Sequence, residues 1–206
     1  SFAFKGLDVE VVRACRMISL VRQFDVIMLR EILTKALPAD FGDYGRNEFG
    51  GLLSRLRSTQ LVLWDDRRKG YALDPTLRHI LGEYIRRDNP ELYVQVNLYA
   101  IEVYRDWIMR AGDNRGIYIV EELYQQACAN TVLAKTSPKK KVDLTLLLKQ
   151  RIEEHQQTDF DLRASALDRL HHELESDSDL TQLIGSDGLS QLLGIVRYGR
   201  VGSRVS

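Results

Sequence analysis

The chain has 206 residues, enough for one large domain or two small ones that each bury a core. Its residues are 44% hydrophobic and 28% charged, which is ordinary for a soluble globular protein, and no apolar run is long enough to span a membrane. The 29 lysines and arginines balance the 29 aspartates and glutamates, which excludes the strong basic field typical of many nucleic-acid-binding and membrane-surface proteins.

Three amphipathic helices are predicted first, over residues 8–20, 25–37 and 46–58. Asp8 and Asp25 are expected to be the N-caps of the first two, and Pro38 marks the end of the second. The polar stretch ADFGDYG that follows is expected to be a connection. Gly50 and Gly51 lie inside the third helix, where they are expected to allow close helix packing or a bend.

A β-hairpin is predicted next, in the stretch QLVLWDDRRKGYALDP at 60–75. Two short apolar runs flank a charged turn over 65–70 that closes with a glycine. Leu61, Leu63 and Leu73, or the alternate residues of the same strands, are expected to anchor the hairpin to the helices. Three helices followed by strand, turn and strand is the order of a winged helix.

The rest of the chain reads as all-α. A fourth helix begins at Pro75 with Asp74 as its N-cap and ends near Asn89. The expected domains are a winged helix over 1–88, a helical hairpin over 89–134, a linker over 135–141 and a helical region over 142–206. Within them, further helices are predicted over 91–111, 117–134, 142–156, 160–175, 179–184 and 187–196. The basic tail RYGRVGSRVS is expected to fray.

The sequence contains no pattern for catalysis. It lacks the phosphate loop, the dinucleotide-binding turn, the nucleophile elbow and the zinc-protease motif. The adjacent His171 and His172 point about 100° apart on a helix, which favours a solvated surface pair over a metal site. The acidic pairs are expected to be solvated helix faces and caps; they are Glu121 with Glu122, Glu153 with Glu154, and Asp177 with Asp179. We therefore expect no enzymatic activity, no catalytic residue, no cofactor and no metal.

The two cysteines, Cys15 and Cys128, lie in apolar helical contexts and are expected to be buried free thiols. No signal peptide is visible, so a cytoplasmic location is expected. The chain opens without a methionine, at SFAFKG, which suggests a fragment of a longer protein.

One alternative is a winged-helix transcription regulator, in which the third helix enters the DNA major groove and the hairpin contacts the phosphates. The helical region would then serve for dimerisation or sensing. The residues that would contact DNA are Arg46, Asn47, Arg55, Arg57, Arg67, Arg68 and Lys69. Glu48, Asp65 and Asp66 lie among them and would repel phosphates.

Three stretches resemble one protein family over about residues 8–130. RMISLVRQFDVIMLREIL resembles the segment after the ATPase module of STAND-class signal-transduction ATPases, where an R-x-F-D step joins the first two helices of a winged helix. GYALDPTLRHILGEYI is similar to their passage from the wing into the next helix. PELYVQVNLYAIEVYRDWI and EELYQQA resemble the helical hairpin that follows, although Gln125 stands where the family has histidine.

The resemblance implies a non-catalytic regulatory fragment of a larger, bacterial-type signalling ATPase. Its winged helix would pack on an upstream nucleotide-binding module or a partner chain, and the nucleotide chemistry would belong to that module. The oligomeric state is left open. The resemblance also implies which residues shape the turn between the first two helices, namely Arg22, Phe24 and Asp25, and which build the helix after the wing, namely Arg78, Leu81 and Tyr84.

Overall fold

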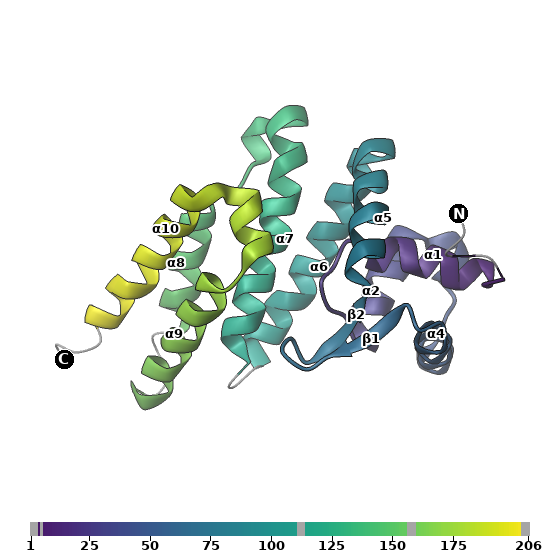
Figure 1. Cartoon of the computed structure of the whole chain (residues 1–206), viewed down its shortest axis with the longest axis horizontal. Coiled ribbons are helices and arrows are strands. Elements are labelled where there is room, and N and C mark those ends of the chain that lie inside the picture. The colour runs from purple at the N-terminus through teal and green to yellow at the C-terminus, as the bar shows by residue number, and fades with distance from the viewer. Residues whose placement is uncertain (1–3, 5, 111–113, 156–159, 203–206) are drawn as a thin grey trace. The chain divides into compact units, whose positions relative to one another are not determined.

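The computed structural model describes residue 4 and residues 6–110, 114–155 and 160–202 (Figure 1). The described residues are mainly helical and contain one small antiparallel sheet of two strands, which confirms the predicted helical class. Residues 1–103 and 104–206 form two compact units, and helix α6 contributes residues to both. The expected domain boundaries at 88, 134 and 141 stay predictions.

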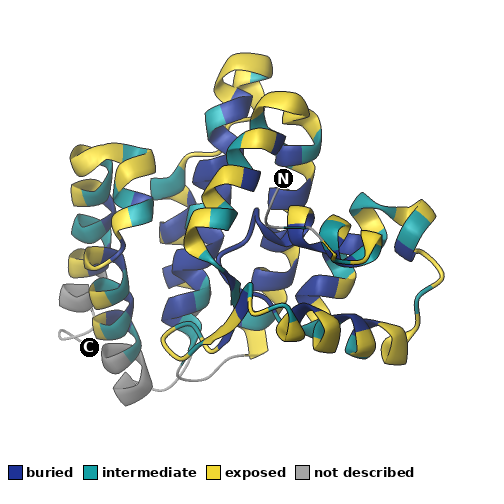
Figure 2. Cartoon of the chain, turned by 45° about the vertical axis from the view of Figure 1, so that its right-hand side comes forward, coloured by how far each residue is buried: buried dark blue, intermediate teal, exposed yellow. Residues whose placement is uncertain are grey.

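The described residues of the first unit contain five complete α-helices and the beginning of a sixth. Their bounds are α1 (Val9–Ile18), α2 (Val26–Ala36), α3 (Pro38–Phe41), α4 (Arg46–Ser58), α5 (Pro75–Asp88) and α6 (Pro90–Arg110). The expected N-caps are confirmed, because the side chains of Asp8, Asp25 and Asp74 accept hydrogen bonds from the first backbone N–H groups of α1, α2 and α5. Helix α1 packs against α2, α4 and α5, and the residues between these helices are buried (Figure 2).

Two details of the first unit differ from the sequence prediction. The expected connection begins with the short helix α3, which fully buries Phe41 in contact with Tyr44 and Phe49. A single buried aromatic side chain gives no periodic signal, so the pattern could not show this turn of helix. Gly50 and Gly51 lie in a continuous helix, and a Cβ at either position would meet no atom within 4 Å. Close packing therefore does not explain these glycines.

The predicted hairpin is present. Strand β1 (Val62–Asp65) pairs antiparallel with β2 (Gly70–Leu73), with Val62 opposite Leu73. These two side chains are buried and anchor the hairpin, whereas Leu63 is 62% exposed, so the expectation for Leu63 was wrong. Successive residues of a strand point to opposite faces, and the register turns Leu63 outward.

The second unit contains the end of α6 and the remaining helices. Their bounds are α7 (Arg115–Thr136), the 3-10 helix η2 (Pro138–Lys140), α8 (Leu144–His155), α9 (Phe160–Glu175) and α10 (Ser178–Gly202). Gly185 breaks α10 with φ 77° and ψ 165°, which divides it into the two predicted helical segments. The tail was expected to fray, but helical structure continues to Gly202; residues 203–206 lie outside the described part of the chain.

Helix α7 is buried on nearly every side. It packs against α8, α9 and α10, and its apolar residues join leucines and isoleucines of these helices in one core. At Gly116 the backbones of α7 and α9 approach closely, because a Cβ there would lie 3.2 Å from the backbone nitrogen of Leu170. None of the helices in the described ranges is both long and apolar enough to cross a membrane.

Candidate functional site

The residues that would contact DNA lie on α4 and on the hairpin of the first unit. Arg55 is tied to the start of α1, because its guanidinium pairs with the carboxylates of Asp8 and Glu10, at 2.7 Å from Glu10. Hydrogen bonds from Tyr44 and Arg55 lower the pKa of Glu10, and the bond to Glu10 raises the pKa of Arg55. The charge of Arg55 is therefore matched by two carboxylates of its own chain.

The hairpin turn likewise places carboxylates beside its positive side chains. Asp65 accepts hydrogen bonds from the backbone N–H groups of Arg67 and Arg68, and its second oxygen lies 3.2 Å from the Arg68 guanidinium. Burial opposes ionisation of Asp65, but these bonds outweigh it and lower its pKa. The ammonium of Lys69 lies 3.9 Å from Asp66. Asp65 thus stabilises the turn through its backbone hydrogen bonds, and both aspartates lie beside positively charged side chains.

An aromatic cluster supports the hairpin from one side. Tyr71 packs edge-on against Trp64, with ring centroids 5.1 Å apart, and the guanidinium of Arg57 lies over the Tyr71 ring at 5.3 Å. The backbone of Tyr71 also pairs with that of Phe24, with N–H to O distances of 2.8 Å in both directions. Arg57 is therefore stacked on its own chain, while Arg46 and Asn47 are exposed at the first turn of α4.

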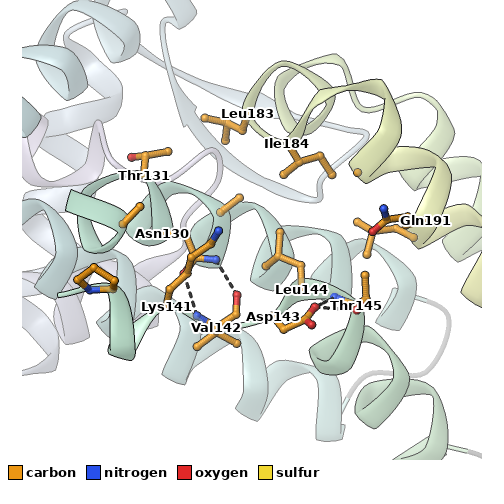
Figure 3. Close-up of a pocket in the computed structure, with 15 residues that line it drawn as sticks. Asn130, Thr131, Lys141, Val142, Asp143, Leu144, Thr145, Leu183, Ile184 and Gln191 are labelled. Carbon is orange, nitrogen blue, oxygen red and sulfur yellow. Dashed lines mark hydrogen bonds between the residues drawn. The ribbon is translucent and has the colours of Figure 1, made fainter. Parts of the chain in front are cut away.

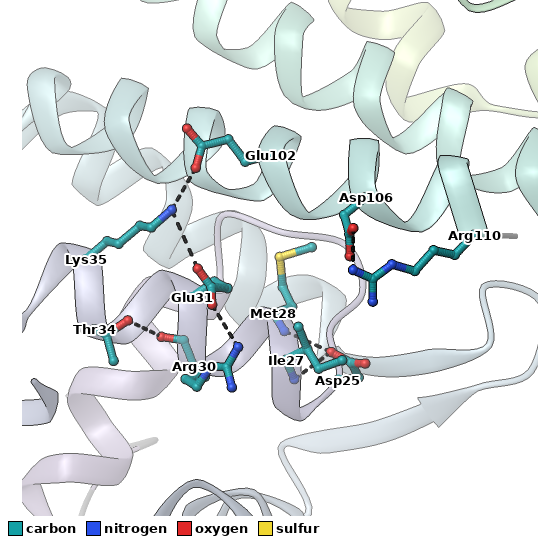
Figure 4. A network of polar contacts seen from close by, with 10 residues as sticks. All are labelled: Asp25, Ile27, Met28, Arg30, Glu31, Thr34, Lys35, Glu102, Asp106 and Arg110. Atoms are coloured by element: carbon teal, nitrogen blue, oxygen red, sulfur yellow. Dashed lines mark hydrogen bonds and ion pairs between the residues drawn. The ribbon is translucent and has the colours of Figure 1, made fainter. Parts of the chain in front are cut away.

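Helices α2 and α6 are also joined in the first unit by an exposed ion pair (Figure 4). The ammonium of Lys35 lies 2.7 Å from Glu102 on α6 and 3.5 Å from Glu31, and it sits over the ring of Tyr99. The Asp25 side chain accepts hydrogen bonds from the N–H groups of Ile27 and Met28. Exposed pairs of this kind contribute little to stability, so we assign this network to local structure rather than to a site.

A cleft in the second unit lies between the end of α7, the chain that follows it, and α10 (Figure 3). Its volume is about 640 Å³. Asn130 fixes one wall, because its amide donates to the carbonyl of Val142 at 2.8 Å and accepts from the Val142 N–H at 3.1 Å. Gln126 donates to the same Asn130 oxygen. This clamp holds the segment before α8 against α7.

A second cleft of about 780 Å³ continues along α8 and α10. Thr145 and Gln191 line both clefts. The second cleft extends past Lys149 and Ile195 to Tyr198, which is 82% exposed. The sequence analysis missed this surface, since its lining residues come from three segments that only tertiary packing brings together.

The expectation that Glu121 and Glu122 are solvated was wrong, because both are buried on α7. Both carboxylate oxygens of Glu122 accept hydrogen bonds from the guanidinium of Arg151, at 2.7 Å each, and Arg105 lies 2.8 Å from one of them. Glu154 binds the same Arg151 from the exposed side at 2.7 Å. A buried bidentate pair of this kind holds α8 on α7 and is a structural element.

Within the described ranges, no group of three or more His, Cys, Asp or Glu side chains could hold a metal ion. Cys15 and Cys128 are buried free thiols, as predicted. Burial raises the pKa of the Cys15 thiol to about 12, which leaves it a poor nucleophile at neutral pH. Asp177 is buried and caps α10 through the N–H of Leu180, which confirms its expected role as a cap.

No protein-family model, curated protein or solved structure matches this chain.

Proposed function

We propose that the chain is a non-catalytic regulatory and protein-interaction fragment of a larger, cytoplasmic STAND-like signalling ATPase. In this proposal the first unit is an internal winged helix, and the second unit is a helical arm. The order of α1, α2, α4 and the hairpin supports the winged helix. The backbone pairing of Phe24 with Tyr71 adds support, because it ties the R-x-F-D step between α1 and α2 to the hairpin.

The observation that carries the proposal is the pairing of the positive charges on the hairpin and α4. Arg55, Arg68 and Lys69 lie beside carboxylates of the same chain, and Arg57 is stacked on an aromatic ring. Binding DNA would require these carboxylates to approach phosphates or the pairs to break, and either change costs free energy. The hairpin is thus better suited to an internal structural role.

An exposed apolar pair on α5 suits the docking of a protein module. Ile80 and Tyr84 are 58% and 55% exposed and lie one helical turn apart, while Leu81 and Ile85 on the other side of α5 are buried. The resemblance implies that Tyr84 builds this helix, and its exposure leaves the ring available to a partner. In the proposal this face meets the upstream nucleotide-binding module, which would be encoded earlier in the same reading frame.

The alternative is a DNA-binding transcription regulator, and the exposed Arg46 and Asn47 at the start of α4 favour it. The discriminating experiment titrates the chain into a labelled random DNA duplex at low salt and follows fluorescence anisotropy. Our proposal expects no change. A saturable rise that weakens with salt and disappears in the R55A/R67A/R68A variant would instead establish the DNA-binding alternative.

The reading frame that encodes the chain supplies a second test. Our proposal expects a phosphate loop upstream in the same frame. A frame that begins at Ser1 or close to it would contradict the proposal, because no nucleotide-binding module would then share the chain.

A further inference from the structure

The two clefts of the second unit form one groove between α8 and α10, because they share Thr145 and Gln191. Past the break at Gly185, the α10 residues that line it include Gly188, Gln191, Ile195 and Tyr198, three or four positions apart, and α8 adds Thr145, Lys149 and Ile152. This spacing places each set on one face of its helix. Leu183 and Ile184 line the groove from the segment before the break. The groove therefore follows two helix faces along the length of α8, whose 12 residues span about 18 Å.

About half of the residues that line the groove are apolar. Ile184 and Ile195 pack on the core and are half-buried from the groove side. Val142, Leu183 and Tyr198 remain 38%, 37% and 82% exposed. A helix of three or four turns fits a groove of this kind, and it would cover these residues with apolar side chains spaced three or four positions apart.

One end of the groove is positively charged. Lys141 lines it, and Lys139 and Lys140 precede Lys141 in an exposed run. Among the side chains that the structure describes, none forms an ion pair with these three lysines. Lys149 adds a further positive charge on the wall of α8.

Nearby carboxylates offset part of this charge. Asp143 is directed to its own helix, because it accepts hydrogen bonds from the N–H and hydroxyl of Thr145, and these bonds lower its pKa. Glu153 lies in the second cleft, away from the lysine run, and Asp187 lies beside the groove on α10. The lysine run at 139–141 thus remains the most strongly charged part of the rim.

We propose that this groove binds an amphipathic helical segment of a partner protein, whose apolar face fills the groove and whose acidic end meets Lys139, Lys140 and Lys141. The inference deepens the interaction role proposed above and rests on it. The apolar contacts supply the affinity, and the lysines fix the direction of the bound helix and accelerate its association.

The test is a display selection against the immobilised full chain, with a library of random peptides of about 16 residues, which form about four helical turns. Enriched peptides are expected to carry apolar residues three or four apart and acidic residues clustered at one end. Their affinity is measured by fluorescence anisotropy and is expected to fall when salt rises from about 50 to 300 mM.

Three variants locate the binding site. Q191W places a bulky ring at the residue shared by both clefts and is expected to weaken binding at least tenfold, about 1.4 kcal/mol. K139Q/K140Q/K141Q is expected to weaken acidic peptides and to remove most of the salt dependence. The control Q182W makes the same change at an exposed position of α10 outside the groove and is expected to bind as the wild type does. Circular dichroism verifies that each variant is folded.

Any of four results would overturn the inference. These are a selection that enriches no peptide, enriched peptides without acidic residues, peptides whose binding survives Q191W, and a concentration-dependent dimer of the chain that Q191W abolishes. The last result would assign the groove to a second copy of the chain. None of them depends on the DNA titration, so a failure of the groove can be distinguished from a failure of the proposed function.

Discussion

Replacement of Arg151 by methionine is expected to destabilise the second unit by about 3 kcal/mol. The guanidinium forms two hydrogen bonds of 2.7 Å with Glu122, whose side chain is only 1% exposed. Methionine fills a similar volume but leaves the carboxylate buried without its main partner. Removal of one partner from such a pair costs about 3–5 kcal/mol. The lower end applies here because Arg105 still lies 2.8 Å from one Glu122 oxygen.

Urea unfolding followed by tryptophan fluorescence measures this loss. The chain has two tryptophans, and Trp107 belongs to the second unit, where it packs on Tyr104 and Tyr118. A Trp64→Phe background therefore leaves a signal from the second unit alone. A loss of stability below about 1 kcal/mol would lie in the range of exposed ion pairs. It would refute the reasoning that the buried Glu122 carboxylate depends on Arg151.

Two further variants separate the buried charge from the packing. R105M removes a half-exposed partner and is expected to cost less than about 1 kcal/mol. The double variant E122L/R151M removes both buried charges together and is expected to lose less stability than R151M alone, because apolar residues of similar volume replace such pairs at little cost. If the double variant instead loses as much stability as R151M and a single E122L variant lose together, Glu122 and Arg151 are not coupled as the distances indicate.

Three other predictions follow from local contacts. Burial raises the pKa of Asp25 above its unfolded value, so its contribution to stability is complete below the unfolded pKa and is lost as pH rises through the folded pKa. The stability of D25N relative to wild type should therefore increase from about pH 4 to pH 7, and a constant difference in urea titrations would contradict this. Gly51→Ala should stabilise the chain by about 0.5–1 kcal/mol, because the new Cβ meets no atom. Gly116→Val should destabilise it by about 1–3 kcal/mol, because the new side chain meets the Leu170 backbone. Melting temperatures equal to that of the wild type would contradict both predictions. Both cysteines should resist Ellman's reagent in the folded chain and react after urea unfolding, because they are buried and burial raises the pKa of Cys15 to about 12. Fast reaction of either thiol in the folded chain would contradict their burial.

Local signals were sufficient to predict most helices and the hairpin. The caps at Asp8, Asp25 and Asp74 act on N–H groups two or three residues away, so the sequence alone carries this information. The same holds for Pro75, which begins α5, and for the charged turn of the hairpin. These elements depend on neighbours in the chain, and neighbours are visible in a sequence.

The buried charge and the groove could not be predicted in this way. Glu122 lies 29 residues from Arg151, and nothing in the neighbouring residues distinguishes its carboxylate from a solvated one. Thr145 and Gln191 line both clefts although 46 positions separate them in the sequence. Leu63 shows the same limit at short range, because both faces of its strand are apolar and only the register with β2 decides which face is buried.

The contacts of the hairpin also connect α5 to the start of α2. The Phe24 backbone pairs with Tyr71 on β2, so the hairpin is fixed to the turn between α1 and α2. At its other end, the Asp74 N–H donates to the carbonyl of Leu61 at 2.8 Å, and the Asp74 side chain caps α5. A displacement of α5 would therefore pull on both strands, and the strain would reach the start of α2 through three backbone hydrogen bonds. The turn between the strands is held by Asp65 and Asp66, which lie beside Arg68 and Lys69.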